Sequence, residues 1–277
     1  MRAVVSPDVV APDDVTSGVA AAASRLQDAA LSRQPCTPVR DLIGPGDVDA
    51  AYAVQQLVTA ARLAGGARVV GRKIGLTADA VRRQLGVSQP DFGTLFADMA
   101  YGSGEPIPLA RLMQPRIEAE VAFVLASDLD VPDPCVADVL RATGFVLAAV
   151  EVVDSRIAGW DLRISDTVAD AASSGAFVLG TVPHQLSGLD LAQVGVVVEG
   201  GGEALSVGAG AACMGSPVIA VMWLAREAAR RGAPLRAGEV VLSGALGPVV
   251  DISGPGRYRA RFDGLGEVDV VFEEDPA

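Results

Sequence analysis

The feature that constrains the fold most is an alternating segment, IEAEVAFVL, at residues 117–125. In a β-strand alternate side chains share a face, so one face of this segment carries only apolar side chains. The opposite face carries Glu118 and Glu120, followed by the small Ala122. The pattern predicts a strand that packs its apolar face into the core and presents two adjacent carboxylates on the other side.

Three glutamates in two such strands predict a metal site. Glu118 and Glu120 repel each other unless water or a cation lies between them. Glu151 lies in a second apolar strand, LAAVEVV at residues 147–153, where a lone carboxylate is costly unless it is paired or liganded. Three carboxylates form a hard, oxygen-rich site suited to Mg²⁺ or Mn²⁺, with coordination positions left for substrate and water. The alternative is a solvated strand face for Glu118 and Glu120, with Glu151 paired to Arg156.

Strand patterns dominate the chain from Ile107 onward, and one late helix, capped by Ser216 and ended by Gly232, interrupts them. Strands that follow one another with so few helices favour a mainly antiparallel, strongly curved sheet over a parallel α/β fold. The predicted fold class is α+β. The strands are expected at residues 117–125, 145–153, 177–179, 194–198, 204–207, 239–242, 258–262 and 268–272.

The beginning of the chain is predicted to be helical. A cap at Thr16 or Ser17 opens an alanine-rich helix, and a proline-rich linker follows it. A second helix is expected at residues 48–64, because Asp47 can cap its start and glycine follows its end. The chain therefore divides into an N-terminal helical region, residues 1–66, and a β-rich metal-binding catalytic core, residues 67–277.

The sequence favours a cytoplasmic protein. The first residues lack the long apolar stretch of a signal peptide, and no uncharged apolar run reaches the ~18 residues that span a bilayer. The cysteines, Cys36, Cys135 and Cys213, are far apart and form no CxxC pair. Such spacing is typical of thiols in a reducing compartment.

Charge and histidine content exclude several functions. The formal net charge is -12, which argues against nucleic acid and against an anionic membrane surface. A small anionic substrate remains compatible if a metal or a local Lys or Arg reverses the field in a cleft. His184 is the single histidine, so a His-rich zinc site is impossible and a Ser-His-Asp triad would depend on one loop residue. Acid–base chemistry is left to carboxylates, Lys and Tyr.

Two further segments carry candidate catalytic groups. GRKIGLT at residues 71–77 places Lys73 between two glycines at the end of an apolar strand, and Thr77 is expected to cap a short helix. Glycines let the backbone approach a ligand closely, and Lys73 could contact an anionic group or donate a proton. QPDFG at residues 89–93 predicts a turn that carries Asp91, a candidate general base. The alternatives are an exposed lysine and a plain turn.

These segments occur in the order and spacing of a known family, together with EVVDSR, SDTVAD, SSG and LSGALG at residues 151–156, 165–170, 173–175 and 242–247. Over roughly residues 45–273 the chain resembles the 2-keto-4-pentenoate (2-hydroxypenta-2,4-dienoate) hydratase and 4-oxalocrotonate decarboxylase family of the fumarylacetoacetate hydrolase superfamily. The resemblance implies a small N-terminal helical part and a curved mixed β-sheet core of fumarylacetoacetate hydrolase type. It implies homo-oligomers and leaves association with another enzyme of the pathway open. It also implies Mg²⁺ or Mn²⁺ at the positions Glu118, Glu120 and Glu151.

The family's chemistry assigns roles to the remaining candidates. Its enzymes chelate the carboxylate and the 2-oxo or 2-enol oxygen of a small acid on the metal. Hydratases ketonise a 2-hydroxy-2,4-dienoate and add water to give a 4-hydroxy-2-oxo acid, whereas decarboxylases release CO₂ from a vinylogous 2-oxo-enedioate. Lys73 is expected to hold a substrate oxygen, and Asp91 is expected to transfer a proton or activate water. Hydrogen bonds to the substrate are expected from Ser173, Ser243 and Gly244.

Two positions depart from the family pattern. Ala171 stands where the family has Asn, and Ser216 stands where it has Asn or His; if those side chains touch the distal end of the substrate, specificity has shifted. LSGALGP at residues 242–248 favours a hydratase. The alternatives are a decarboxylase, another hydrolase or isomerase of the superfamily, and a non-catalytic scaffold subunit, against which the intact carboxylates, Lys73 and Asp91 argue.

Overall fold

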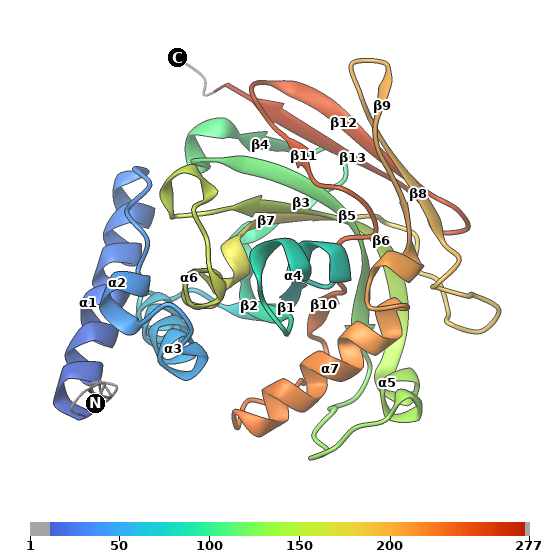
Figure 1. Ribbon diagram of the computed structural model, residues 1–277. Coiled ribbons are helices and arrows are strands. Elements are labelled where there is room, and N and C mark those ends of the chain that lie inside the picture. Colours follow the sequence, from blue (N-terminus) through green and yellow to red (C-terminus); the bar gives the residue numbers. More distant parts are fainter. Residues whose placement is uncertain (1–11, 275–277) are drawn as a thin grey trace, which may run out of the picture.

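The computed structural model describes residues 12–274 and has an α+β fold, as the sequence predicts. Two β-sheets form its centre, with helices α1, α2 and α3 gathered on one side and α7 and α5 on another (Figure 1). None of the described helices is long and apolar enough to cross a membrane. The helices are α1 (Pro12–Ser32), α2 (Arg40–Ile43), α3 (Val48–Ala64), α4 (Asp79–Leu85), α5 (Val136–Ala142), α6 (Ile164–Ala169) and α7 (Pro217–Arg230).

The larger sheet is mixed and strongly curved. Most of its neighbouring strands are antiparallel, whereas β1 with β10 and β3 with β7 are parallel. The short strand β11 (Val250–Asp251) pairs with β5 beside this path. In order across the sheet, the strands are β2 (Asp91–Phe96), β1 (Val69–Gly75), β10 (Val240–Leu242), β5 (Pro115–Leu125), β6 (Thr143–Asp154), β7 (Ser174–Leu179) and β3 (Ala100–Gly102).

The smaller sheet is a departure from the single curved sheet predicted from the strand pattern. Glycine-rich hairpin turns join β8 to β9 and β12 to β13, and β13 contacts β6 and β7 of the larger sheet. Strongly twisted sheets split into two packed layers when strands are added, which accounts for the second sheet. Its order is β4 (Pro106–Pro108), β13 (Gly266–Glu273), β12 (Gly256–Phe262), β8 (Gly195–Gly200) and β9 (Glu203–Ala209).

Strand β5 has the two faces that its alternation predicts. Its apolar face is buried in the main core through Ile117, Ala119, Val121, Phe123 and Leu125. The concave face carries the glutamates and continues into a small apolar cluster from five strands. That cluster consists of Leu95, Ala122, Leu147, Ala149, Phe177 and Leu242. The glutamates of β5 therefore border a dry surface and not bulk water.

Several element boundaries differ from the prediction. Helix α1 spans Pro12–Ser32, so the predicted caps Thr16 and Ser17 lie inside it. The Asp47 cap of α3 is confirmed: its side chain accepts a hydrogen bond from Ala50 N. Ala78, and not Thr77, precedes α4. Helices α5 and α6 were not predicted, since each is shorter than the window over which helical periodicity is visible.

Helix α3 is hydrogen-bonded to the site-bearing part of the chain. The buried amide of Gln55 donates to Phe92 O at 2.9 Å and to Val168 O at 2.8 Å. Phe92 lies on β2 and Val168 on α6. One helical side chain thus fixes the strand that carries Asp91 relative to the helix that carries Thr167.

Candidate metal and substrate site

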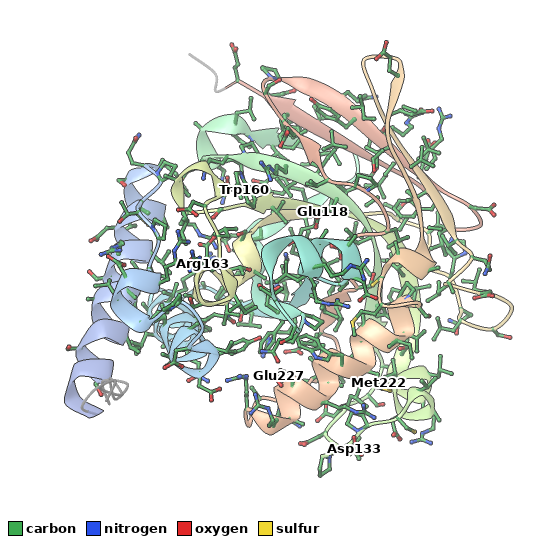
Figure 2. The ribbon with its side chains drawn as sticks, viewed as in Figure 1. Glu118, Asp133, Trp160, Arg163, Met222 and Glu227 are labelled. Carbon is green, nitrogen blue, oxygen red and sulfur yellow. The ribbon has the colours of Figure 1, made fainter. Side chains whose placement is uncertain are left out.

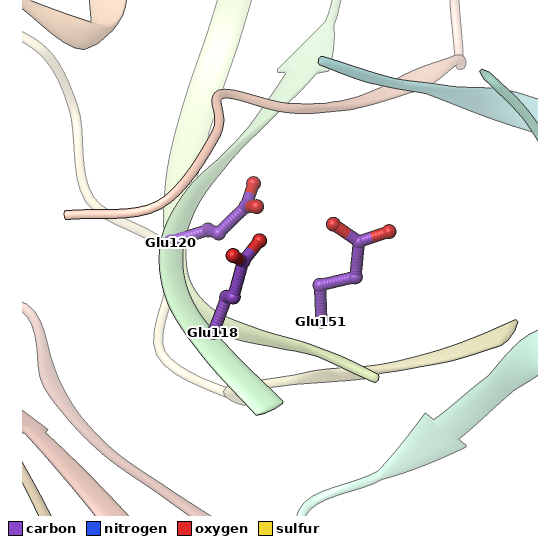
Figure 3. Close-up of side chains that lie close together, drawn as sticks. All are labelled: Glu118, Glu120 and Glu151. Carbon is purple, nitrogen blue, oxygen red and sulfur yellow. The ribbon is translucent and has the colours of Figure 1, made fainter. Parts of the chain in front are cut away.

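Glu118, Glu120 and Glu151 converge on one point of the concave face (Figure 3). Glu118 lies directly opposite Glu151 across the antiparallel pair of β5 and β6, and Glu120 follows two residues along β5. One carboxylate oxygen from each lies within 4.8 Å of the other two. No other group of His, Cys, Asp and Glu side chains is gathered in this way within residues 12–274.

The surroundings oppose negative charge on these groups. Glu120 and Glu151 are fully buried, so the alternative of a solvated strand face is wrong for Glu120. Burial, assisted by the charges of Glu151 and Glu118, raises the pKa of Glu120 well above its usual value. Burial likewise raises the pKa of Glu151 to about 7, although Lys73 opposes the shift. The cluster without a metal therefore retains protons near neutral pH.

The cluster also has the free oxygens that a cation would need. Glu120 Oε1 and Glu151 Oε2 are buried without a hydrogen-bond partner among the described residues, and Glu151 Oε1 has only an ion pair with Lys73. Gly244 N donates to the remaining oxygen, Glu120 Oε2, at 2.7 Å. Buried carboxylate oxygens without partners are rare because their desolvation is uncompensated. Their number and hardness fit Mg²⁺ or Mn²⁺.

Lys73 is buried, contrary to the alternative of an exposed strand-end lysine. Its side chain is 2% exposed, its Nζ lies 3.0 Å from Glu151 Oε1, and it donates to Ala172 O at 2.7 Å. Burial alone would lower the pKa of Lys73, but Glu151, Glu118 and the other nearby carboxylates outweigh it and raise the pKa. The ammonium group therefore stays charged. Glu151 pairs with this lysine and not with Arg156, which pairs with Asp170.

The prediction that Asp91 lies in a turn, made from its Pro-Asp context, is wrong. Asp91 is the first residue of strand β2. Thr167 Oγ1 donates a hydrogen bond to Asp91 Oδ2, whereas Oδ1 is buried without a partner. Burial raises the pKa of Asp91, and Lys73 and the Thr167 hydroxyl partly offset the rise. A Cβ atom at Gly75 would collide with Oδ1. That glycine is therefore required where β1 meets β2.

A left-handed turn closes one side of the site. Ala171, Ala172 and Ser173 all have positive φ, 52°, 50° and 56°, a region that non-glycine residues rarely occupy. The turn directs Ala172 O to Lys73, and Ser173 Oγ donates to Asp170 Oδ2 at 3.0 Å. Because these dihedral angles depend on tertiary contacts, nothing in the sequence predicts them.

The predicted substrate-binding residues are not all equivalent. Ser173 lines the cavity beside the cluster. The Ser243 hydroxyl is engaged with backbone, accepting from Val121 N at 3.3 Å and donating to Gly244 O at 3.2 Å, and it lies outside the cavity lining. Gly244 has φ +99°, and a Cβ there would collide with Thr77. Gly244 thus holds Glu120 through its backbone N–H, whereas the Ser243 hydroxyl bonds only to backbone.

A cavity of about 350 Å³ opens beside the cluster. Its polar lining includes Lys73, Asp91, Arg116, Glu118, Thr167 and Ser173. Its apolar lining includes Val81, Val153, Trp160, Leu162, Pro248 and Val249. A larger cavity of about 500 Å³ lies between α1, α3 and the edge strand β3, but it shares no lining residue with the first and contains no member of the cluster.

Sequence reasoning missed four residues of this site: Thr167, Ala172, Arg116 and Trp160. Thr167 lies in the SDTVAD segment that carries the family resemblance, but nothing in the sequence indicates that its hydroxyl bonds to Asp91. Arg116 precedes the alternating segment by one residue and continues its glutamate face. Alternation extended by one position would have found it.

Comparisons with known proteins agree with this geometry. A sequence model of the family described as fumarylacetoacetate (FAA) hydrolase C-terminal matches residues 68–271. A 2-keto-4-pentenoate hydratase of Burkholderia vietnamiensis is 53% identical over 258 residues, which cover 93% of this chain and 98% of that protein. A 2-hydroxyhexa-2,4-dienoate hydratase of Comamonas testosteroni is 40% identical over 90% of this chain and 96% of that protein.

A solved structure extends the comparison. The 4-oxalocrotonate decarboxylase from Pseudomonas putida G7, complexed with magnesium and adipate, superposes with a TM-score of 0.89 at 33% identity and covers 93% of this chain and 98% of that one. The chain belongs to the fumarylacetoacetate hydrolase superfamily and, within it, to the 2-keto-4-pentenoate hydratase and 4-oxalocrotonate decarboxylase family.

Proposed function

We propose that this chain is a divalent-metal-dependent hydratase, which adds water to a 2-hydroxy-2,4-dienoate through its 2-oxo-3-enoate form to give a 4-hydroxy-2-oxo acid. The observation that carries the proposal is the buried convergence of Glu118, Glu120 and Glu151 with unpartnered oxygens. Hydratases at 53% and 40% identity over nearly the full chain support the reaction class.

The three glutamates would hold Mg²⁺ or Mn²⁺, and the magnesium of the decarboxylase structure supports a divalent ion. Bound there, the ion would act as a Lewis acid on the carboxylate and 2-oxo oxygens of the substrate. Lys73 keeps a fixed positive charge beside Glu151, which favours negative charge developing on the substrate oxygen. Lys73 would therefore supply this positive charge at a site that contains no histidine among its described residues.

Asp91 is assigned the proton transfers. Ketonisation moves the 2-hydroxyl proton of the dienol to C5, and hydration then adds the hydroxyl of water to C4 and its proton to C3. A buried carboxyl with a raised pKa can hold a proton at one step and accept one at another. Thr167 fixes the orientation of Asp91 by its hydrogen bond to Oδ2, and Oδ1 remains free to meet the reacting atoms.

A metal-dependent decarboxylase of a vinylogous 2-oxo-enedioate is the second candidate, supported by the structure that is 33% identical. The relatives at 53% and 40% identity are both hydratases, which favours the hydratase. A scaffold subunit has no physical reason to bury Glu120, Glu151, Lys73 and Asp91 together beside Glu118.

Incubation with 2-hydroxypenta-2,4-dienoate and Mg²⁺, followed by mass spectrometry, tests the proposal. The expected product has gained one water. Loss of CO₂ from an enedioate without hydration of the dienoate would indicate the decarboxylase, and no turnover of either would favour the scaffold. EDTA is expected to abolish activity and Mg²⁺ or Mn²⁺ to restore it, whereas full activity after metal removal would refute the metal requirement.

The same family membership supports a homo-oligomer, and the net charge of -12 opposes binding to nucleic acid or to an anionic membrane surface. A cytoplasmic location stays a prediction. Light scattering on the purified protein tests the first point. The division into residues 1–66 and 67–277 also stays a prediction.

A further inference from the structure

Arg116 lies on the face of β5 that carries the glutamates. Alternate residues of a strand share a face, so Arg116, Glu118 and Glu120 follow one another at about 6.6 Å intervals. Arg116, Glu118 and Trp160 line the same cavity. Glu118 and Trp160 are labelled in Figure 2. Because β5 begins at Pro115, Arg116 lies at the outer end of this row.

Charge makes this position important. Among the described residues that line the cavity, only Lys73 and Arg116 are basic. Lys73 is already bonded to Glu151 and to Ala172 O. An anionic substrate entering beside three glutamates and Asp91, in a chain of net charge -12, needs a further positive charge. Arg116 is the one that remains.

The present partner of Arg116 is easily displaced. Its Nε lies 2.7 Å from Asp251 Oδ1, but the Asp251 side chain is 80% exposed and that of Arg116 is 32% exposed. Exposed ion pairs of this kind contribute little to stability. A substrate carboxylate in a drier position can take the place of Asp251, because a guanidinium binds a carboxylate through two parallel hydrogen bonds.

The guanidinium is nevertheless held in place. Its Cζ lies 4.2 Å from the centre of the Trp160 ring. Gln114 fixes the loop that carries Trp160 by donating to Ser155 O and Ile157 O and accepting from Gly159 N. Trp160 itself has φ +57°, which is strained for a bulky residue and is maintained only where surrounding contacts enforce it.

We infer that Arg116 binds the carboxylate of the 2-oxo acid substrate and releases Asp251 when it does so. The inference rests on the proposed function, which places the substrate carboxylate and its neighbouring 2-oxo oxygen at the glutamate cluster. Arg116 is the adjacent cation, and Trp160 keeps the guanidinium over the cavity. The pair with Asp251 then serves as a resting position.

Pyruvate is a suitable probe, since it has the carboxylate and the 2-oxo group but no distal chain. Calorimetry would measure its affinity for the Mg²⁺-loaded wild type, Arg116→Gln, Arg116→Lys and Asp251→Asn, and the Mg²⁺ affinity of each. Arg116→Gln should weaken pyruvate binding about 10- to 100-fold and leave Mg²⁺ affinity within about twofold. Arg116→Lys should lose less, and Asp251→Asn should bind pyruvate at least as tightly as the wild type.

The outcomes separate this inference from the function on which it rests. Pyruvate binding to the wild type with an unchanged affinity in Arg116→Gln would overturn the role of Arg116 alone. An equal loss in Asp251→Asn and Arg116→Gln would overturn the exchange of partners. No binding of pyruvate to the Mg²⁺-loaded wild type would overturn both the proposed chelation and the inference.

Discussion

Lys73 Nζ lies 3.0 Å from Glu151 Oε1, although β1 and β6, which carry them, are separated in the sheet by β10 and β5. Such an approach is possible only because the sheet curls until non-adjacent strands face each other. The lysine therefore occupies one side of a carboxylate that a metal would approach from another side. Under the proposed function, Lys73 and a bound cation would compete electrostatically for Glu151 while both favoured negative charge on a substrate.

Lys73→Met tests this competition. Removing a positive charge next to Glu151 should let Mg²⁺ bind at least as tightly as in the wild type, while turnover falls by about 10²-fold or more. Calorimetry and steady-state kinetics measure the two effects on the same preparation. Weaker Mg²⁺ binding in the variant would show that Lys73 holds the cluster in shape instead of competing with the ion.

Glu118→Gln should have the opposite effect on the metal. Losing one anionic ligand is expected to weaken Mg²⁺ binding by at least about tenfold, with the fold retained because Glu118 is partly exposed to the cavity. Glu239→Gln is the matched control, since Glu239 lies 3.6 Å from Arg72 and outside the cluster. Equal Mg²⁺ affinity in Glu118→Gln and the wild type would contradict the ligand assignment.

The stability of the metal-free protein should fall as pH rises. Burial raises the pKa of Glu151 from 4.5 to about 7, so the folded state favours the protonated form. The contribution of protonated Glu151 to the free energy of unfolding is fully present below about pH 4.5 and is lost as pH rises through about 7. Thermal unfolding measured between about pH 5 and about pH 8 should show that the melting temperature of the metal-free protein falls as pH rises. Mg²⁺ should restore the melting temperature mainly at the alkaline end.

Glu151→Gln provides the control for this experiment, because an amide cannot titrate. The melting temperature of the metal-free variant should fall less with rising pH than that of the wild type, and Mg²⁺ should raise it only slightly. A wild-type protein whose metal-free melting temperature rises steadily across the same interval would contradict the assignment of raised carboxyl pKa values.

Asp91→Asn should abolish most of the activity, by about 10²- to 10⁴-fold, because an amide cannot carry the proton. Thr167→Val removes only the hydrogen bond that orients Asp91 and should cost less in kcat. It should also shift the pH profile, since the Thr167 hydroxyl lowers the pKa of Asp91. Circular dichroism checks the fold of both, and wild-type activity in Asp91→Asn would remove Asp91 from the mechanism.

Ala171→Asn should stabilise the protein. Ala171 has φ 52°, and asparagine tolerates this left-handed conformation better than alanine does. The expected gain in the free energy of unfolding is about 0.5–1 kcal/mol, measured by chemical denaturation. Ala204→Asn is the control, because Ala204 is exposed and is not among the residues with positive φ; an equal gain in both variants would refute the explanation by strain.

Periodicity predicted the parts of the site that lie on regular strands. The alternation around Glu118 and Glu120 located β5 and its two faces, and the ordered motifs identified the family, which the 53% identical relative confirms. Asp91 was assigned to a turn because proline precedes it. Strand β2 is buried throughout and so lacks an alternating pattern.

Relationships that depend on curvature could not be predicted. Arg156 is only five residues from Glu151 in sequence and was the obvious candidate partner, yet Lys73 reaches Glu151 across the curled sheet. The left-handed turn at residues 171–173 likewise follows from contacts with β1 and β2. Local sequence has no signal for contacts of this range.

The two hydrogen bonds of Gln55 have a consequence for the history of such a chain. The Gln55 amide on helix α3 donates to a backbone carbonyl of β2, the strand that carries Asp91, and to one of α6, the helix that carries Thr167. Exchange of the helices for those of a relative without this glutamine would remove the donor that both carbonyls share. The helical region and the catalytic sheet are therefore expected to have been inherited as one unit.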